Sequence, residues 1–204
     1  FEMEIIGETL DDSIGEAFDK CGKLLGLNYP AGSKIDRLAK NGDKKKFKFS
    51  IPKVKELDFS FSGLKTNFKR FIENNISENK NFIEKEKENI CASIQETIVK
   101  ILLEKIIKGI NKTNTKTIVF GGGVSANSRI RESCKKEFKN CKLFFPKIEY
   151  TTDNAAMIAL VGYLKFKEKN FTNYDVESRA RYKIWTNYFT CLLYTSDAAD
   201  ECLC

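Results

Sequence analysis

The sequence has 204 residues, of which 42% are hydrophobic and 31% are charged, so it is long enough for about one domain with a buried core. It contains no histidine, which excludes Ser-His and Cys-His catalysis and any histidine metal ligand within this chain. No run of 18 or more apolar residues and no signal-peptide pattern is present, so we expect no membrane span and a cytoplasmic location. Because the chain opens without Met, we expect a fragment of a longer protein.

The net charge of +7 is unevenly distributed. The last 18 residues carry three acids and no Lys or Arg, so residues 1–186 carry +10. A basic body suits an anionic partner such as a nucleic acid or a nucleotide, although an AT-rich genome also enriches lysine. The cysteines form no C-x-x-C pair, and those before the C-terminal segment are expected to be reduced thiols.

Apolar residues at helical spacing predict helices over residues 12–25, 33–40, 62–75, 89–111, 126–139 and 153–169. Apolar, β-prone runs predict strands over residues 116–120 and 142–146. Ser33 and Ser62 are the predicted N-caps of their helices, and Gly26 is predicted to end the first helix. Residues 40–56 hold seven lysines and Pro52 and are expected to form a surface loop. The alternation of strands and helices predicts an α/β fold.

The segment "CLLYTSDAADE", residues 191–201, does not look like an evolved protein sequence. It resembles the translated reverse complement of a sequencing-library adapter. We therefore expect residues 187–204 to be a non-native tail and residues 1–186 to form the domain. The alternative is a short amphipathic C-terminal segment.

The stretch "IVFGGGVSANSRIRESC", residues 118–134, combines a strand, a glycine turn and a helix, which is how a backbone approaches a phosphate. Gly121, Gly123 and Ala126 fit the dinucleotide spacing G-x-G-x-x-A. The acid that should end the next strand is absent, since Glu149 lies beyond it, and the turn lacks the Gly-Lys-Ser/Thr of a Walker loop. The spacing alone leaves open a nucleotide or phosphate turn and a plain tight turn.

Four blocks stand in order along the chain: "GETLDDSIGEAFDKCGKLLGLNYPAGSKIDRLAK", "LDFSFSGLKT", "GGGVSANSRIR" and "TTDNAAMIALVGYLKF". Together they resemble the tRNA threonylcarbamoyl-adenosine transferase family (TsaD type, once described as glycoprotease or peptidase M22) over nearly all of residues 1–182. The resemblance implies an actin-like, sugar-kinase and Hsp70-like fold, of which this chain would be an incomplete second lobe with a C-terminal helix. It also implies transfer of threonylcarbamoyl from threonylcarbamoyl-AMP to N6 of adenosine 37 in ANN-decoding tRNA, with TsaB- and TsaE-type proteins as further partners.

Asp19 shares a helix face with Asp12 and Glu16, a spacing that by itself favours a solvated acidic stripe. The resemblance instead implies that the carboxylate of Asp19 binds the nucleotide. It also implies that Gly32 lets the backbone approach the ligand and that Asp36 makes a further ligand contact. The alternatives are a turn glycine at position 32 and an exposed helix acid at position 36.

Asn127 ends the glycine turn, where it can cap the next helix or reach a ligand. Asp153 opens the last predicted helix, where an N-cap is the ordinary role. The resemblance implies that Asn127 contacts the substrate and that Asp153 is one ligand of a divalent metal, Fe²⁺ or Zn²⁺. The two histidines that complete the metal site in the family are absent from this sequence, so we expect an inactive piece of the enzyme.

Two basic segments are weaker candidates for tRNA contact. The lysines of residues 40–55 either meet the tRNA phosphates or form an ordinary solvated loop. The run "ESRARYKIW", residues 177–185, either touches tRNA or forms a packed C-terminal strand. It departs from the family's closing motif at Ala180 and Tyr182, so it receives no role.

Two other functions compete with a transferase fragment. The first is a non-catalytic paralogue that acts as a dimer partner in the same modification complex. The second is an ATP-dependent sugar kinase or chaperone of the same fold.

Overall fold

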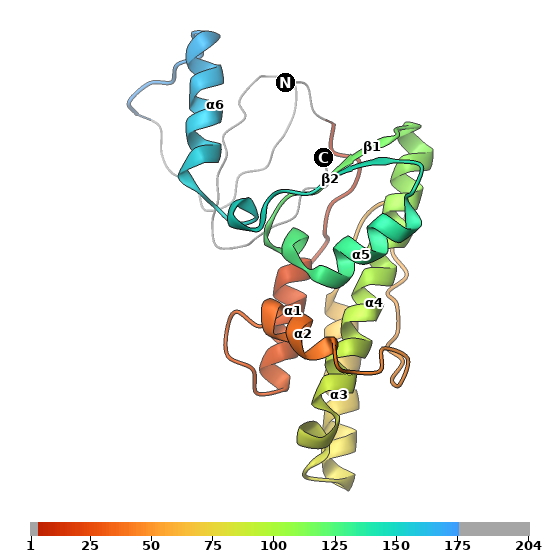
Figure 1. The fold of residues 1–204 in the computed structure, drawn as a ribbon. Helices are drawn as coiled ribbons and strands as arrows, with labels where there is room; N and C mark the ends of the chain where they lie inside the picture. Colours follow the sequence, from red (N-terminus) through yellow and green to blue (C-terminus); the bar gives the residue numbers. More distant parts are fainter. Residues whose placement is uncertain (1–3, 176–204) are drawn as a thin grey trace.

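A computed structural model describes residues 4–175 of the chain (Figure 1). The helices are α1 Ile14–Leu24, α2 Gly32–Ala39, α3 Ser62–Glu78, α4 Phe82–Thr113, α5 Ser128–Glu137 and α6 Ala155–Lys167. The strands are β1 Thr117–Val119 and β2 Lys142–Phe144, and the 3-10 helices are η1 Gly123–Ala126 and η2 Ile148–Tyr150. The predictions for residues 177–185 and for the tail 187–204 lie outside the described residues.

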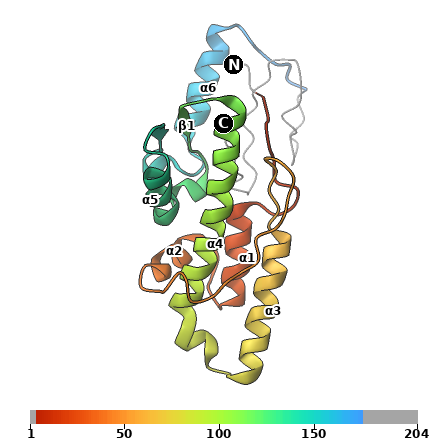
Figure 2. The same cartoon turned by 90° about the vertical axis from the view of Figure 1, so that its right-hand side faces the viewer.

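The body of the molecule is a helical layer in which α1 packs against α2 and α3, and α4 packs against α2, α3 and α5 (Figure 2). Each helix turns its apolar stripe inward, because residues spaced three or four apart share one face. The predicted stripe of α4 is confirmed, since all its members are buried: Ile90, Ile94, Ile98, Ile101, Leu102 and Ile106. Phe18 of α1 and Phe68 of α3 fill the space between these helices.

The strands form a two-stranded parallel sheet within the described residues, and α5 makes the connection between them. In the register, Ile118 lies opposite Leu143 and Val119 opposite Phe144. Ile118 is buried against the helical body, whereas Val119 and Phe144 are exposed. The predicted α/β class is therefore confirmed, with the glycine turn leaving the carboxyl end of β1.

Two predicted N-caps are wrong. Helix α2 begins at Gly32 with Ala31 at its N-cap, so Ser33 lies inside the helix. The reason is the position of Ala31: its N–H is bonded to Asp19 of α1, and Gly22 leaves room for its side chain, since a Cβ added at Gly22 would lie 2.2 Å from the Cβ of Ala31. Helix α3 has Phe61 at its N-cap, and Ser62 is its first residue.

The start of α4 also differs from the prediction, whereas the end of α1 agrees with it. Helix α4 starts at Phe82 rather than Asn89, because the charged stretch between them lacks an apolar period but still forms a helix. Gly26 ends α1 as predicted, with a positive φ of 71° that favours glycine.

The lysine-rich segment 40–56 contains no helix or strand, as expected. Two of its lysines are paired with acids of α4, Lys46 with Glu86 at 2.6 Å and Lys44 with Glu96 at 3.9 Å. These pairs reduce the free positive charge of the loop.

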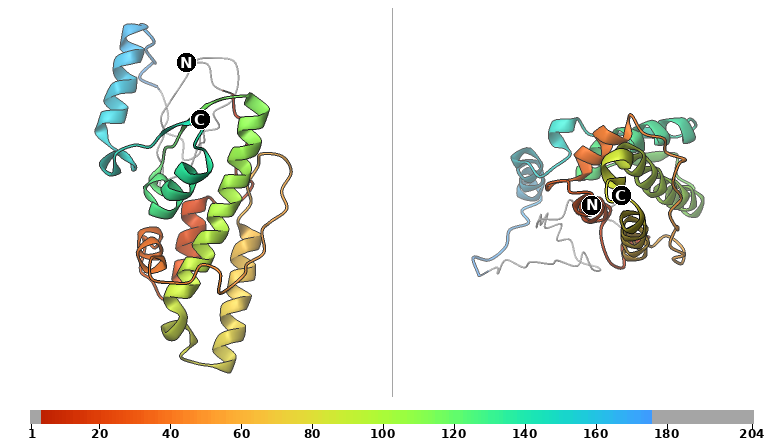
Figure 3. Two further views of the ribbon diagram at one scale, coloured as in Figure 1. Left: turned by 45° about the vertical axis from the view of Figure 1, so that its right-hand side comes forward. Right: turned by 90° about the horizontal axis from the view of Figure 1, so that it is seen from below.

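Helix α6 stands apart from the helical body (Figure 3) and buries none of its residues. Between residues 4 and 175, no helix has both the length and the apolar character needed to cross a membrane.

Candidate functional site

The glycine turn at the end of β1 has the open geometry that the sequence predicts. Gly122 has φ 76° and ψ 167°, a backbone conformation that side chains rarely adopt. A Cβ added at Gly121 would meet no atom within 4 Å. The turn closes when the N–H of Ser125 donates to the carbonyl of Gly122 at 3.1 Å, which starts η1.

Asn127 joins this turn to α5. Its Oδ1 accepts a hydrogen bond from the N–H of Ile130 at 3.0 Å, so the capping role is confirmed. The residue is 8% exposed. Because the cap uses the oxygen, the Nδ2 donor is the part of the side chain left for a ligand.

Asp19 does not belong to an acidic stripe. Lys20 forms ion pairs with both Asp12 and Glu16, which gives those two acids a structural partner. Asp19 instead accepts a hydrogen bond at Oδ1 from the N–H of Ala31 at 2.5 Å. This bond ties α1 to the residue that precedes Gly32.

Gly32 lies at the start of α2 with little around it. A Cβ added there would meet only the Cβ of Phe18, at 3.8 Å. No described neighbour therefore requires glycine at this position. The freedom is consistent with the close approach of a ligand, which stays a prediction.

Asp36 is engaged by the protein itself. Its Oδ2 accepts from the N–H of Ser128 at 3.0 Å, and its Oδ1 accepts from the Ser128 hydroxyl at 2.8 Å. The Nε2 of Gln95 on α4 donates to the same Oδ1 at 3.0 Å. A direct contact between Asp36 and a ligand stays a prediction.

These bonds bring four of the five predicted site residues into one cluster. The contact of Asp19 with Ala31 positions the start of α2, where Gly32 lies. The contact of Asp36 with Ser128 then joins α2 to the residue that follows Asn127. We call Asp19, Gly32, Asp36 and Asn127 the turn cluster.

Arg131 also holds the turn, and the sequence interpretation missed it. Its Nε donates to the carbonyl of Ser125 at 2.6 Å, and its Nη2 donates to the carbonyl of Pro146 at 2.8 Å. The guanidinium lies 5.2 Å from the ring centroid of Phe145. A guanidinium that bonds two backbone carbonyls has no local sequence signature, because both partners are main-chain groups.

A cavity of about 80 Å³ borders the turn. Ser125 lines it, and the Ser125 hydroxyl is buried without a hydrogen-bond partner among the described residues. Most of the other walls are apolar, including Ile14, Phe61, Leu102 and Phe120. Ligand pockets are usually several hundred Å³, so this cavity by itself is too small to enclose a nucleotide.

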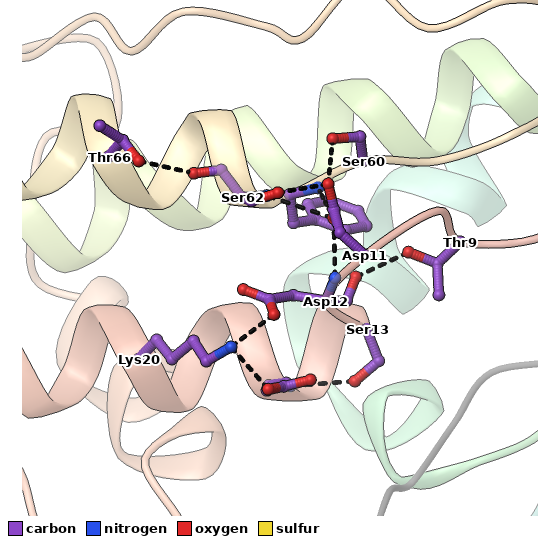
Figure 4. Close-up of polar contacts among 10 residues, drawn as sticks. Thr9, Asp11, Asp12, Ser13, Lys20, Ser60, Ser62 and Thr66 are labelled. Carbon is purple, nitrogen blue, oxygen red and sulfur yellow. Dashed lines mark hydrogen bonds and ion pairs between the residues drawn. The ribbon is translucent and has the colours of Figure 1, made fainter. Parts of the chain in front are cut away.

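A second polar cluster links the first two of the four sequence blocks, through Asp11 in the first block and Ser60 and Ser62 in the second (Figure 4). The carboxylate of Asp11 accepts hydrogen bonds from the hydroxyls of Ser60 and Ser62 and from the N–H groups of Phe61 and Ser62. Burial raises the pKa of Asp11, but these hydrogen bonds, together with the N–H of Asp12, outweigh it and lower the pKa to about 2. Asp11 thus supplies the capping oxygen that Ser62 was predicted to provide for α3.

Within residues 4–175, Asp153 makes no hydrogen bond to the turn cluster. Asn154, not Asp153, caps α6, and its Oδ1 accepts from the N–H of Met157 at 3.1 Å. The capping alternative for Asp153 is therefore wrong, and its carboxylate is exposed.

The residues present do not by themselves fit a transition metal. No group of three or more Cys, Asp or Glu side chains within the described part of the chain is arranged to hold one, and the sequence has no histidine. One exposed carboxylate does not retain Fe²⁺ or Zn²⁺ against water.

Three buried cysteines, Cys21, Cys91 and Cys134, are unsuited to nucleophilic catalysis. Burial raises the pKa values of Cys21 and Cys91 to about 12 and that of Cys134 to about 11. The reactive form of cysteine is the thiolate. These side chains are therefore core residues.

A parallel strand–turn–helix unit with an open glycine turn at the carboxyl end of its strand is typical of α/β proteins that bind nucleotides or phosphates. The model of the family described as tRNA N6-adenosine threonylcarbamoyltransferase (TsaD) matches residues 1–160. The chain belongs to this family, and the resemblance stated from its four blocks is confirmed.

Curated relatives agree with the family match. The tRNA N6-adenosine threonylcarbamoyltransferase of Christiangramia forsetii is 50% identical over 185 residues, which are 90% of this chain and 54% of that protein. Proteins of the same name from Riemerella anatipestifer and Thermosipho africanus are each 44% identical, again over 90% of this chain and 54% and 55% of their own lengths. The chain thus spans about half the length of the curated relatives it matches.

Proposed function

We propose that this chain is part of an enzyme that transfers a threonylcarbamoyl group from threonylcarbamoyl-AMP to N6 of adenosine 37 in ANN-decoding tRNA. The observation that carries the proposal is the turn cluster, in which α1, α2 and the glycine turn meet through the hydrogen bonds of Asp19 and Asp36. An open glycine turn beside a capped helix N-terminus suits the phosphate of an adenylate.

Three residues of the turn cluster would contact the adenylate. The Oδ2 of Asp19 is suited to accept a hydrogen bond from a ribose hydroxyl, since Oδ1 already holds Ala31. Gly32 leaves room for the ligand beside the start of α2. The Nδ2 of Asn127 is suited to donate to an acceptor on the nucleotide.

In the transfer, the N6 amine of adenine attacks the carbonyl carbon of the threonylcarbamoyl group. The bond from that carbon to the phosphate oxygen breaks, AMP leaves, and the amine loses one proton. The role of this chain in the step is to hold the adenylate so that the carbonyl faces the incoming amine. No covalent intermediate on a cysteine is needed, in agreement with the buried, high-pKa thiols of Cys21, Cys91 and Cys134.

We further propose that the chain forms much of one lobe of an actin-like, sugar-kinase and Hsp70-like fold and that the enzyme acts in the cytoplasm with TsaB- and TsaE-type partners. Asp153 would give one carboxylate to a divalent metal, Fe²⁺ or Zn²⁺, whose other ligands come from outside this chain. This role is supported by two observations: the carboxylate of Asp153 is exposed, and it is not used as the N-cap of α6.

The test is AMP binding by calorimetry, together with mass spectrometry of adenosine 37, on the full-length enzyme that carries this chain. Asp19→Ala and Asn127→Ala should each weaken AMP binding by about tenfold or more, which is the loss of one charge-assisted or well-placed hydrogen bond. Glu16→Gln is the matched control on α1, because Glu16 pairs only with Lys20 among the described side chains. If both site variants bind AMP as tightly as the parent, the site lies elsewhere.

A further inference from the structure

We propose that the outward face of α2 binds the backbone of the tRNA, with Arg37 and Lys40 contacting phosphates next to the target adenosine. The inference rests on the proposed function, because the position of the tRNA is argued from the adenylate site in the turn cluster. It gives the second substrate a surface on this chain, beside the site of the first.

Helix α2 carries its cations on one side. Lys34, Arg37 and Lys40 are spaced three residues apart, and Lys40 at the C-cap keeps helical φ and ψ. Residues three apart are neighbours on a helix surface, so these side chains share a face. The apolar residues lie on the other side, where Ile35 is fully buried and Leu38 packs against the core. We call Lys34, Arg37 and Lys40 the α2 stripe.

No acid neutralises the α2 stripe within residues 4–175. Arg37 and Lys40 are exposed, and none of the ion pairs in this part of the chain involves them or Lys34. The ammonium of Lys34 donates to a neutral partner, the carbonyl of Asn28, at 2.7 Å. The one acid of α2, Asp36, contacts α4 and α5 instead. The outward face of α2 thus presents positive charge to the solvent.

The lysine-rich loop that follows α2 is less suited to a polyanion. Lys46 pairs with Glu86 at 2.6 Å, and Lys44 lies 3.9 Å from Glu96. Asp43 adds a further acid to the same loop. An RNA backbone would have to compete with these acids for the lysines, whereas the α2 stripe lacks such partners. The stripe is therefore the better candidate for phosphate contact.

The α2 stripe begins at the turn cluster. Gly32 is the first residue of α2, and Asp36 in the middle of α2 accepts bonds at 3.0 and 2.8 Å from Ser128, the first residue of α5. Arg37 directly follows Asp36, and Lys40 lies about 12 Å from Gly32 along the axis, at a rise of about 1.5 Å per residue. Helices α2 and α5 lie on the same side of α4 (Figure 2). The stripe therefore borders the place proposed for the adenylate.

The transfer brings RNA phosphates to this border. N6 of adenosine 37 has to reach the carbonyl that is attached to the adenylate phosphate, so the backbone on both sides of adenosine 37 passes close to the turn cluster. Arg37 offers a guanidinium that can hold a phosphate through two N–H groups, and Lys40 offers an ammonium. Contacts to phosphates position a nucleic acid but do not read its sequence. The stripe should thus add affinity without selecting among tRNAs.

The experiment measures binding of an unmodified ANN-decoding tRNA to the full-length enzyme that carries this chain, by fluorescence anisotropy at several salt concentrations. Arg37→Gln and Lys40→Gln should each raise the Kd about three- to tenfold, the loss of one charged contact. Each should also reduce the dependence of log Kd on log salt by about 0.7, and the double variant by about 1.4, the counterion release expected for single-stranded phosphates. Lys34 is left in place because it also holds Asn28.

The double variant of Lys135→Gln and Lys136→Gln is the matched control. Both lysines are exposed in the last turn of α5, and neither makes an ion pair within residues 4–175. The control removes the same net charge from another surface, so it should change the Kd of tRNA by less than about twofold, the effect of a screened, distant charge. Equal losses in the two double variants would mean that net charge alone drives binding, which would overturn the proposal.

AMP binding separates this proposal from the proposed function. The calorimetric Kd of AMP should not change in Arg37→Gln or Lys40→Gln, since neither residue belongs to the turn cluster. The ratio of the Kd values for ANN-decoding and other tRNAs should also stay constant. A parent enzyme that does not bind AMP refutes the adenylate site. The α2 surface is judged by tRNA alone: unchanged tRNA affinity in both variants, or no tRNA binding by the parent enzyme, overturns it.

Discussion

The turn cluster and α6 show two ways in which candidate site residues are held. In the turn cluster, Asp19 and Asp36 are each fixed by a partner distant in sequence, Ala31 and Ser128 respectively, and Asn127 is fixed by the helix that it caps. Helix α6 follows Asp153, yet none of its residues is buried. The turn cluster is therefore held by contacts within this chain, whereas no hydrogen bond or ion pair holds the Asp153 side chain within residues 4–175.

Helix α6 is rich in apolar residues although it is exposed, unlike the helices of the body. Its exposed large side chains include Ile158, Leu160, Tyr163 and Phe166, and they are distributed around the helix rather than along one stripe. A helix that is apolar on all sides is normally a buried one. Helix α4, in contrast, turns its apolar stripe into the core, and all its charged residues except Lys105 are at least partly exposed. The difference indicates that Asp153 depends on surfaces outside the described residues.

The largest expected effect is on the free energy of unfolding, and it distinguishes the helical body from α6. Phe68 is fully buried and Phe166 is 66% exposed. Phe68→Ala should lower the free energy of unfolding by about 3–5 kcal/mol, because it leaves a cavity in the helical body. Phe166→Ala should change it by no more than about 0.5 kcal/mol. Urea denaturation of the chain measures both, and equal losses would show that α6 packs as tightly as the body.

A smaller effect on stability tests the close packing of α2 against α1. Gly22→Ala places a Cβ 2.2 Å from the Cβ of Ala31, and the overpacking should cost about 1–3 kcal/mol. This outweighs the gain of roughly 1 kcal/mol that Ala has over Gly in a helix. Adding Ala31→Gly removes the clash, so the double variant should be more stable than Gly22→Ala alone. Thermal melts decide it, and a double variant as unstable as the single one contradicts the close contact of α1 and α2.

The third effect concerns Asp11 and depends on pH. Asp11→Ala should cost about 1–2 kcal/mol at pH 7, the value of a helix cap with further hydrogen bonds. The pKa of Asp11 falls from 3.8 to about 2 on folding, so the stabilisation is complete above about pH 4 and is lost as the pH falls toward 2. Unfolding free energies of the parent and Asp11→Asn should therefore converge over this range. A difference that is constant from pH 7 to pH 2 would mean that the carboxylate charge is not the stabilising feature.

The sequence predicted the elements that carry a strong apolar period and missed features that depend on distant partners. The stripe of α4 and the end of α1 at Gly26 follow from local pattern, and both are confirmed. The contact between Asp36 and Ser128 joins residues separated by 92 positions, and no local pattern encodes it. The start of α4 was placed too late because its first turns are charged rather than periodic.

Neighbouring residues with the same chemistry were the other source of error. Asp153 and Asn154 are both good N-caps, and only the backbone geometry assigns the cap to Asn154. Asp12, Glu16 and Asp19 share a helix face by spacing, but Lys20 pairs with the first two and leaves the third to Ala31. Spacing along the helix placed the three acids on one face, but it could not show which of them pair with Lys20 and which one bonds Ala31.

Hydrogen exchange on the full-length enzyme, with and without AMP, tests the central claim most directly. If the turn cluster forms the adenylate site, AMP should slow exchange in residues 28–36 and 121–131, because ordering of a ligand-bound turn suppresses local opening. Residues 155–167 should show little change from AMP alone, since within residues 4–175 α6 makes no hydrogen bond to the cluster. Protection confined to α6, or AMP binding with no protection at the start of α2 and in the glycine turn, would contradict the account.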